Sequence, residues 1–175
     1  MAKEYIITMT AENRVGIMSA VTKAMTELGA DLREASQTVV RGFFTMIFSA
    51  EFPDNLDPSV IQDHLQDAGR PFGIDINLKD VNIEKKGSVP EPARFYTLRL
   101  GGENQPGILR LLSSTIAISR IDIAGMHAVR TAGGGGFEMV LKIAVPRDFE
   151  VQQFVNQLNQ VGRSFNITAD ISDYS

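Results

Sequence analysis

The sequence feature that most constrains the fold is an internal repeat with an offset of 91 residues. The segment Asn13-Arg14-Val15-Gly16-Ile17 returns as Asn104-Gln105-Pro106-Gly107-Ile108, and Asp31-Leu32 returns as Asp122-Ile123. In both copies the five-residue motif follows an alternating, strand-like run and precedes an amphipathic, helix-like run. The chain is therefore expected to fold as two copies of the same structural unit.

The first copy predicts the order strand, helix, strand, strand, helix, strand. Alternating apolar residues predict the strands, and apolar residues at helical spacing predict the helices. Asn13 is the expected N-cap of the first helix and Gly29 its C-terminal stop, whereas Asp57 and Pro58 form the expected start of the second helix. The expected strands cover residues 5–10, 31–41, 44–52 and 74–78, the last of which could extend to Ile83, and the expected helices cover 17–28 and 58–68.

The second copy repeats this order, with strands expected at 96–100, 122–131, 137–145 and 165–171 and helices at 108–116 and 151–158. The glycine run at 133–136 lengthens the hairpin turn by two residues, a place where insertions cost little. A βαββαβ order predicts the α+β class, with two ferredoxin-like units, each an antiparallel four-stranded sheet with both helices on one face. We expect a first domain at 1–84, a linker at 85–93 and a second domain at 94–175, because the linker segment is polar and contains two prolines.

The charge and composition exclude several classes of protein. The net charge is −4, and neither half has the surplus of Lys and Arg that nucleic-acid binding requires. The chain has no cysteine, so neither disulfides nor thiolate metal sites are expected, and we expect no cofactor. The first residues lack the apolar segment of a signal peptide, and no run approaches the ~20 apolar residues of a membrane helix. The expected compartment is the cytoplasm.

The repeated motif has the chemistry of a small-anion site. A helix start leaves backbone N–H groups unpaired and partly positive, which favours a carboxylate or phosphate. Gly16 and Gly107 would let a ligand approach the backbone closely, and the amides of Asn13 and Asn104 would bind either charged group of an amino acid. The alternative is that each asparagine only caps its helix and each glycine only relieves crowding.

The motif and its setting resemble the ACT domain, a regulatory module that binds amino acids and other small molecules. In the first copy the resemblance rests on residues 13–17 and on Leu28-Gly29-Ala30-Asp31-Leu32. In the second copy it rests on residues 104–108 and on Ile121-Asp122-Ile123. Two such units without another domain are similar to the glycine cleavage system transcriptional repressor group.

This resemblance implies ligands held between the first-helix turn of one unit and a strand of its neighbour. The implied ligand-binding residues are Asn13, Arg14, Val15, Gly16, Ile17, Asp31, Asn104, Gln105, Pro106, Gly107, Ile108 and Asp122. It also implies sheets paired side by side, within the chain or in a homodimer. The expected function is a non-catalytic amino-acid sensor that acts through a regulatory protein partner. The resemblance implies transcription of genes for glycine or amino-acid metabolism as the regulated process.

Three alternatives compete with this interpretation. A ligand-free dimerisation or interaction module would have the same fold. Residues 41–48 partly match the RNA-recognition signature on the third strand of an RRM, but Phe44 and Thr45 do not fit, and we expect no direct binding of nucleic acid. An enzyme is not expected, because no nucleophile–base pair or carboxylate cluster stands out. His64 and His127 have no partners at metal-ligand spacing, so no metal is expected and both are expected at the surface.

Overall fold

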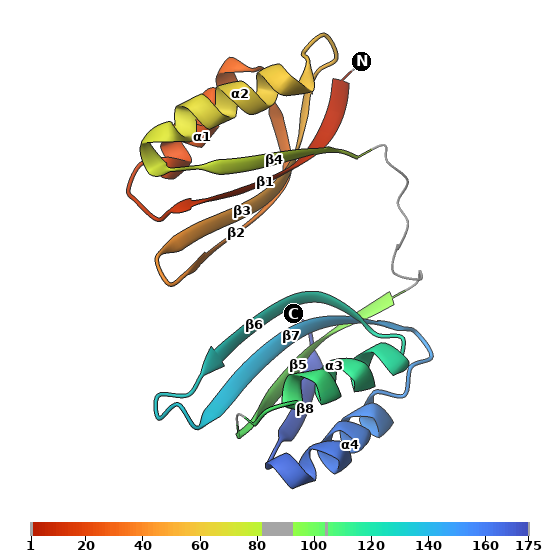
Figure 1. Ribbon diagram of the computed structural model, residues 1–175. Helices are drawn as coiled ribbons and strands as arrows, with labels where there is room; N and C mark the ends of the chain where they lie inside the picture. The colour runs from red at the N-terminus through yellow and green to blue at the C-terminus, as the bar shows by residue number, and fades with distance from the viewer. Residues whose placement is uncertain (1, 82–92, 104, 175) are drawn as a thin grey trace. The chain divides into compact units, whose positions relative to one another are not determined.

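The computed structural model describes residues 2–81, 93–103 and 105–174 (Figure 1). The chain divides into two compact units, Met1–Lys86 and Gly87–Ser175, and each is described here by itself. The predicted linker at 85–93 lies outside the described residues except for Ala93, which begins a strand. Asn104 also lies outside them.

The first unit has the predicted βαββαβ order. Its sheet has the strand order β2-β3-β1-β4, and every neighbouring pair is antiparallel. A short 3-10 helix, Arg70–Phe72, connects the second helix to the last strand. The elements are β1 (Ala2–Glu12), α1 (Ile17–Glu27), β2 (Asp31–Val40), β3 (Phe43–Pro53), α2 (Pro58–Gly69) and β4 (Asp75–Asp80).

The second unit repeats this topology, with the strand order β6-β7-β5-β8. Its elements are β5 (Ala93–Glu103), α3 (Ile108–Ile118), β6 (Asp122–Arg130), β7 (Gly136–Pro146), α4 (Val151–Gly162) and β8 (Thr168–Asp173). The prediction of two ferredoxin-like units of the α+β class is confirmed. The last strand was predicted to begin at Phe165, but Phe165 ends a 3-10 helix, Arg163–Phe165, and Asn166 follows in a left-handed conformation.

In each unit the two helices cover one face of the sheet, as Figure 1 shows. The alternation along β1 explains this arrangement, since Tyr5, Ile7, Met9 and Ala11 are buried while the residues between them are not. Each unit has its own hydrophobic core of such strand residues and the apolar stripes of its helices. Burial of these side chains is the dominant stabilising contribution to each unit.

The prediction of Asn13 as an N-cap is wrong. Helix α1 is preceded by Gly16, which has φ 99° and no side-chain capping bond, and Gly107 precedes α3 with φ 88°. The Asn13 backbone N–H instead donates to the carbonyl of Gly42 at 2.8 Å. The chain therefore enters α1 and α3 through a left-handed glycine, a conformation that L-residues adopt only with strain.

The predicted start of α2 is confirmed. The Asp57 carboxylate accepts a hydrogen bond from the Ser59 N–H at 2.9 Å, and Pro58 occupies the first turn. The Ser59 hydroxyl and N–H both donate to this carboxylate, and these hydrogen bonds lower the pKa of Asp57 below its ordinary value. Sequence rules for caps succeed here because a side chain supplies the cap.

Strands β2 and β6 are sheet edges, and every residue in both strands is exposed. Each strand has one irregularity in its pairing, between Leu32 and Glu34 in β2 and between Ile123 and Gly125 in β6. Several exposed residues on these edges are large and apolar, among them Val40 and Met126. Such edges present unpaired backbone groups to which another strand can bind.

Candidate functional site

The repeated motif forms a small cup in the first unit. The cup has a volume of 330 Å³ and is bounded by the five residues of the motif, 13–17, which lead into α1. Three further residues complete it: Met18 from α1, Gln37 from β2 and Phe44 from β3. Met18, Gln37 and Phe44 were not predicted, because Gln37 and Phe44 reach the motif only through the pairing of β2, β3 and β1.

Arg14 in this cup interacts with three other residues of the first unit. Its Nε lies 3.3 Å from Glu12 Oε2, and its Nη2 donates to the backbone carbonyl of Pro71. The guanidinium also lies 5.7 Å from the centre of the Phe72 ring. An anion in the cup would therefore compete with Glu12 for this charge.

The corresponding cup in the second unit has a volume of 500 Å³. It is bounded by Gln105, Pro106, Gly107 and Ile108 from the motif, followed by Leu109 and Arg110 on α3 and by Arg130 on β6. Neither arginine was among the predicted site residues. Arg130 reaches the cup because the end of β6 lies beside the start of α3, and strand order cannot be deduced from the motif alone.

Glu103 lies beside the helix-entry turn of the second unit, and both of its carboxylate oxygens accept hydrogen bonds. Asn166 Nδ2 donates to one oxygen at 2.7 Å, and Gln105 Nε2 donates to the other at 2.9 Å. These hydrogen bonds, that from Asn166 first, hold the pKa of Glu103 below its ordinary value of 4.5. The ionised carboxylate places a negative charge next to the turn, as Glu12 does in the first unit.

The glycines of the motif have a structural explanation in the backbone. A Cβ added at Gly107 would meet nothing within 4 Å, and one added at Gly16 would meet only the Phe72 ring, at 3.6 Å. Space is thus available at both positions, and the positive φ angles are what favour glycine there. The glycines alone do not indicate a ligand.

The first backbone N–H groups of α1 and α3 make few hydrogen bonds to described residues. The Ile17 N–H makes only a long bond to the Arg14 carbonyl, 3.4 Å, and the Ile108 N–H a similar one to Gln105, 3.3 Å. The first N–H groups of a helix have no intrahelical acceptors, and they carry partial positive charge. The backbone N–H groups at these helix starts are therefore the candidate donors for a carboxylate.

Asp31 and Asp122 lie far from the turn of their own unit. Asp31 is opposite Glu51 on β3, whereas the turn end of β1 is opposite Phe43. Eight strand residues separate these two points, or roughly 26 Å at 3.3 Å per residue. Asp122 has the corresponding position in β6, exposed at the start of the strand. Within one unit the structure does not bring either aspartate together with the motif.

The histidines and acidic residues of the described segments form no group of three or more side chains able to hold a metal ion. His64 was expected at the surface; its side chain is partly exposed, and its Nε2 lies 2.9 Å from Glu27 Oε2. His127 is exposed on β6, as expected. Among the described helices, none is long and apolar enough to cross a membrane.

Comparison with known proteins finds an ACT domain in the first half of the chain and relatives that match about half of its length. The model of the ACT domain matches residues 5–69. A UPF0237 protein of Methanosarcina acetivorans is 30% identical over 83 residues, which are 47% of this chain and 90% of that protein. A UPF0237 protein of Lactococcus lactis is 33% identical over 78 residues, 45% of this chain and 88% of that protein.

Two solved structures share the fold of the whole chain. A protein from Galdieria sulphuraria of unknown function superposes with a TM-score of 0.80 at 21% identity and covers 100% of both chains. A protein assigned to the glycine cleavage system transcriptional repressors has a TM-score of 0.73 at 13% identity and covers 99% of both chains. At these identities the likeness concerns the fold, a tandem pair of ACT-like units.

Proposed function

Since this chain belongs to the UPF0237 family and is built from two ACT-like units, we propose that it is a non-catalytic regulatory protein that senses amino acids at its two helix-entry turns. The observation that carries this proposal is the repeated cup. In both units a left-handed glycine presents the N-terminus of a helix at the base of a small hollow.

The chemistry of the cups suits the two charged groups of an amino acid. The helix N–H groups would bind the carboxylate. The ammonium group would be attracted by the carboxylates of Glu12 in the first unit and Glu103 in the second, which flank the turns. The asparagines of the motif are neutral, so these glutamates supply the negative charge that the motif itself lacks.

The output of such a sensor requires contact with other proteins. We propose homodimerisation through the exposed edges β2 and β6, with ligands lodged between a turn and a strand of the neighbouring unit. This arrangement would give Asp31 and Asp122 a role in a neighbour's site. The likeness to a glycine cleavage system transcriptional repressor supports control of transcription through a protein partner as the regulatory outcome.

A ligand-free interaction module is the second candidate function. It is favoured by the exposed apolar residues on the edge strands, since Val40 and Phe43 are 62% and 61% exposed and lie opposite each other in the first sheet. Such a surface is typical of a protein contact. RNA binding has less support, because Phe44 and Phe48 of the signature-like strand are buried in the core.

Isothermal titration of the full chain with glycine and serine, followed by the other amino acids, tests the sensor proposal. The double variant Asn13→Ala/Asn104→Ala should weaken the binding of any amino acid that saturates the parent protein. Asn55→Ala, in the exposed turn between β3 and α2, is the matched control and should bind normally. Unchanged binding in the double variant would argue against these turns as the sites.

A further inference from the structure

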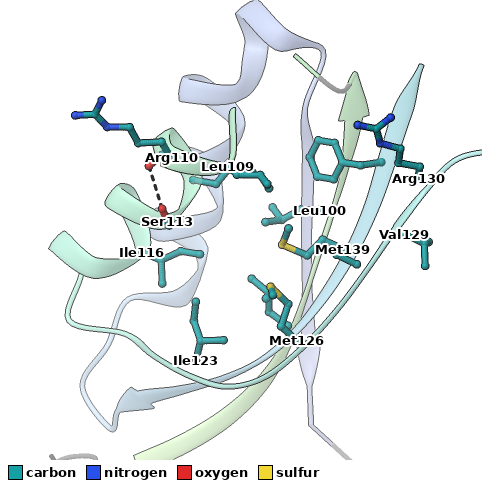
Figure 2. A pocket seen from close by; sticks show the side chains of 14 residues that line it. Leu100, Leu109, Arg110, Ser113, Ile116, Ile123, Met126, Val129, Arg130 and Met139 are labelled. Carbon is teal, nitrogen blue, oxygen red and sulfur yellow. Dashed lines mark hydrogen bonds between the residues drawn. The ribbon is translucent and has the colours of Figure 1, made fainter. Parts of the chain in front are cut away.

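An open groove in the second unit runs between α3 and the edge strand β6, with a volume of 530 Å³ (Figure 2). Its floor consists of buried core residues, including Leu100 and Leu141. Leu109 and Ile116 line it from α3, and Met126 lines it from β6. This volume lies within the range of ~300–1,000 Å³ typical of small-molecule pockets.

The groove exists because the helix layer does not reach the edge strand. Met126 lies opposite Leu141 in the sheet, so both side chains stand on the helix-covered face. Leu141 is fully buried, whereas Met126 is 65% exposed and Ile123 is 40% exposed. An apolar surface that would normally be covered by a helix is therefore open to a ligand.

One end of the groove is positively charged. Arg110 on α3 and Arg130 on β6 border both the groove and the cup at the turn, and the groove has no acidic residue in its lining. Neither guanidinium forms a hydrogen bond or ion pair with another described residue. In Figure 2 Arg130 stands at this end of the groove, whereas Arg110 extends from the far side of the helix.

The first unit has the same fold but different residues at the corresponding positions. With the offset of 91 residues, Arg110 and Arg130 correspond to Ser19 and Val39, and Met126 corresponds to Ala35. Ala128, which lines the groove, corresponds to Gln37, which lines the cup of the first unit. The fold does not require these differences, so the two units are chemically specialised.

We infer that the groove of the second unit binds an amphipathic monocarboxylate, with the carboxylate at Arg130 and an apolar tail along α3 and β6 beside Met126. The inference rests on the proposed function in that it names the ligand class of the second-unit site. Four strand residues separate Met126 from Arg130, about 13 Å at 3.3 Å per residue, so the groove accepts a tail longer than a methyl group. An amino acid with a large apolar side chain and a medium-chain fatty carboxylate share this chemistry.

Titration of the full chain, followed by ¹⁵N NMR, tests the inference with hexanoate, octanoate, leucine, phenylalanine and glycine as probes. We expect octanoate to bind about tenfold more tightly than hexanoate, because each buried methylene tightens binding about three- to fourfold. Resonances of Met126 and Ile116 should shift. Tighter binding of leucine and phenylalanine than of the fatty carboxylates would identify an amino acid as the source, and the reverse order a fatty carboxylate.

Two variants test the contact with the apolar tail and the contact with the carboxylate independently. Met126→Glu should weaken octanoate binding at least tenfold, and its matched control Ala35→Glu, at the corresponding exposed position of the first unit, should not. Arg130→Gln should weaken the binding of octanoate but not of octanamide, which has the same tail without the charge. Both positions are exposed. Circular dichroism of each variant would check that it is folded.

Three outcomes distinguish this inference from the proposed function. Glycine or serine binding at the turns, without any shift from octanoate, leucine or phenylalanine in the groove, overturns the inference and leaves the sensor proposal standing. Octanoate bound in the groove with no amino acid bound at either turn supports the inference and contradicts amino-acid sensing. No binding of any probe, together with a change of oligomeric state in Met126→Glu, overturns the inference and makes the groove a contact between copies.

Discussion

At the scale of single residues, two glycines at the ends of α2 and α4 pack very closely against the residue that precedes the last strand of their unit. A Cβ added to Gly162 would lie 2.6 Å from Ile167 Cβ and 3.3 Å from the Ile167 carbonyl oxygen. Gly69 has the same relation to Ile74 in the first unit. The helix end and the residue before the last strand can therefore approach this closely only where a glycine stands.

We predict that Gly162→Ala destabilises the second unit by about 1–3 kcal/mol, the usual effect of overpacking a well-filled core. Gly133→Ala is the matched control, because its Cβ would meet nothing within 4 Å and its φ is not positive. Urea denaturation of both variants measures the difference. Equal stability of the two variants would show that α4 shifts freely away from Ile167.

Glu103 makes stability depend on pH. Because its hydrogen bonds from Asn166 and Gln105 lower the pKa in the folded state, the ionised carboxylate stabilises the fold above its ordinary pKa of 4.5. This stabilisation is lost as the pH falls through the lowered pKa of the folded protein. We predict that Glu103→Gln is less stable than the parent at about pH 7 and that the difference shrinks as the pH falls below about 4.5. A difference in urea midpoint that persists unchanged at about pH 3 would contradict this account.

At the scale of elements, the repeat and the hydrophobic periodicity were sufficient to predict the order of the α-helices and strands in both units, but not the two 3-10 helices. The periodicity of Tyr5, Ile7 and Met9 identified a strand with one buried face, and the structure buries these three side chains. The fold followed because a βαββαβ order with short connections has few compact solutions.

The details of the sites depended on features that the sequence does not display. Asn13 fits the residue preference of an N-cap, but the left-handed Gly16 stands at the start of α1. Backbone φ angles cannot be deduced from residue preferences at helix ends. Gln37 and Arg130 were missed because they come to the turns through strand order, across large separations in the chain. The groove was missed because it depends on how far α3 extends over β6.

The exposed edges lead to a prediction at this same scale. If β2 or β6 pairs with another copy of the chain, its amides gain hydrogen bonds that a free edge lacks. We expect hydrogen-exchange protection in β2 or β6 to increase with protein concentration, while the short opposite edges β4 and β8 stay unchanged. Protection that does not vary with concentration, in a chain that sediments as a monomer, would contradict the proposed homodimer.

At the scale of the whole molecule, each unit has a complete hydrophobic core drawn from its own strands and helices. A unit of this size buries roughly 60% of the surface that its unfolded chain exposes, which is near the limit for independent folding. We predict that residues 1–86 and 87–175, produced separately, each unfold cooperatively by circular dichroism. A half without a cooperative transition would show that its stability depends on the other half.

The central claim is that this tandem ACT-like protein binds amino acids at its repeated turns. The most direct test is thermal unfolding of the full chain with each of the twenty amino acids over a range of concentrations. A ligand that binds only the folded state stabilises it by about 2.7 kcal/mol at a hundredfold excess over its dissociation constant. The account predicts a concentration-dependent rise in the midpoint with one or a few amino acids. An unchanged midpoint with all twenty at millimolar concentrations would contradict it and favour the ligand-free interaction module.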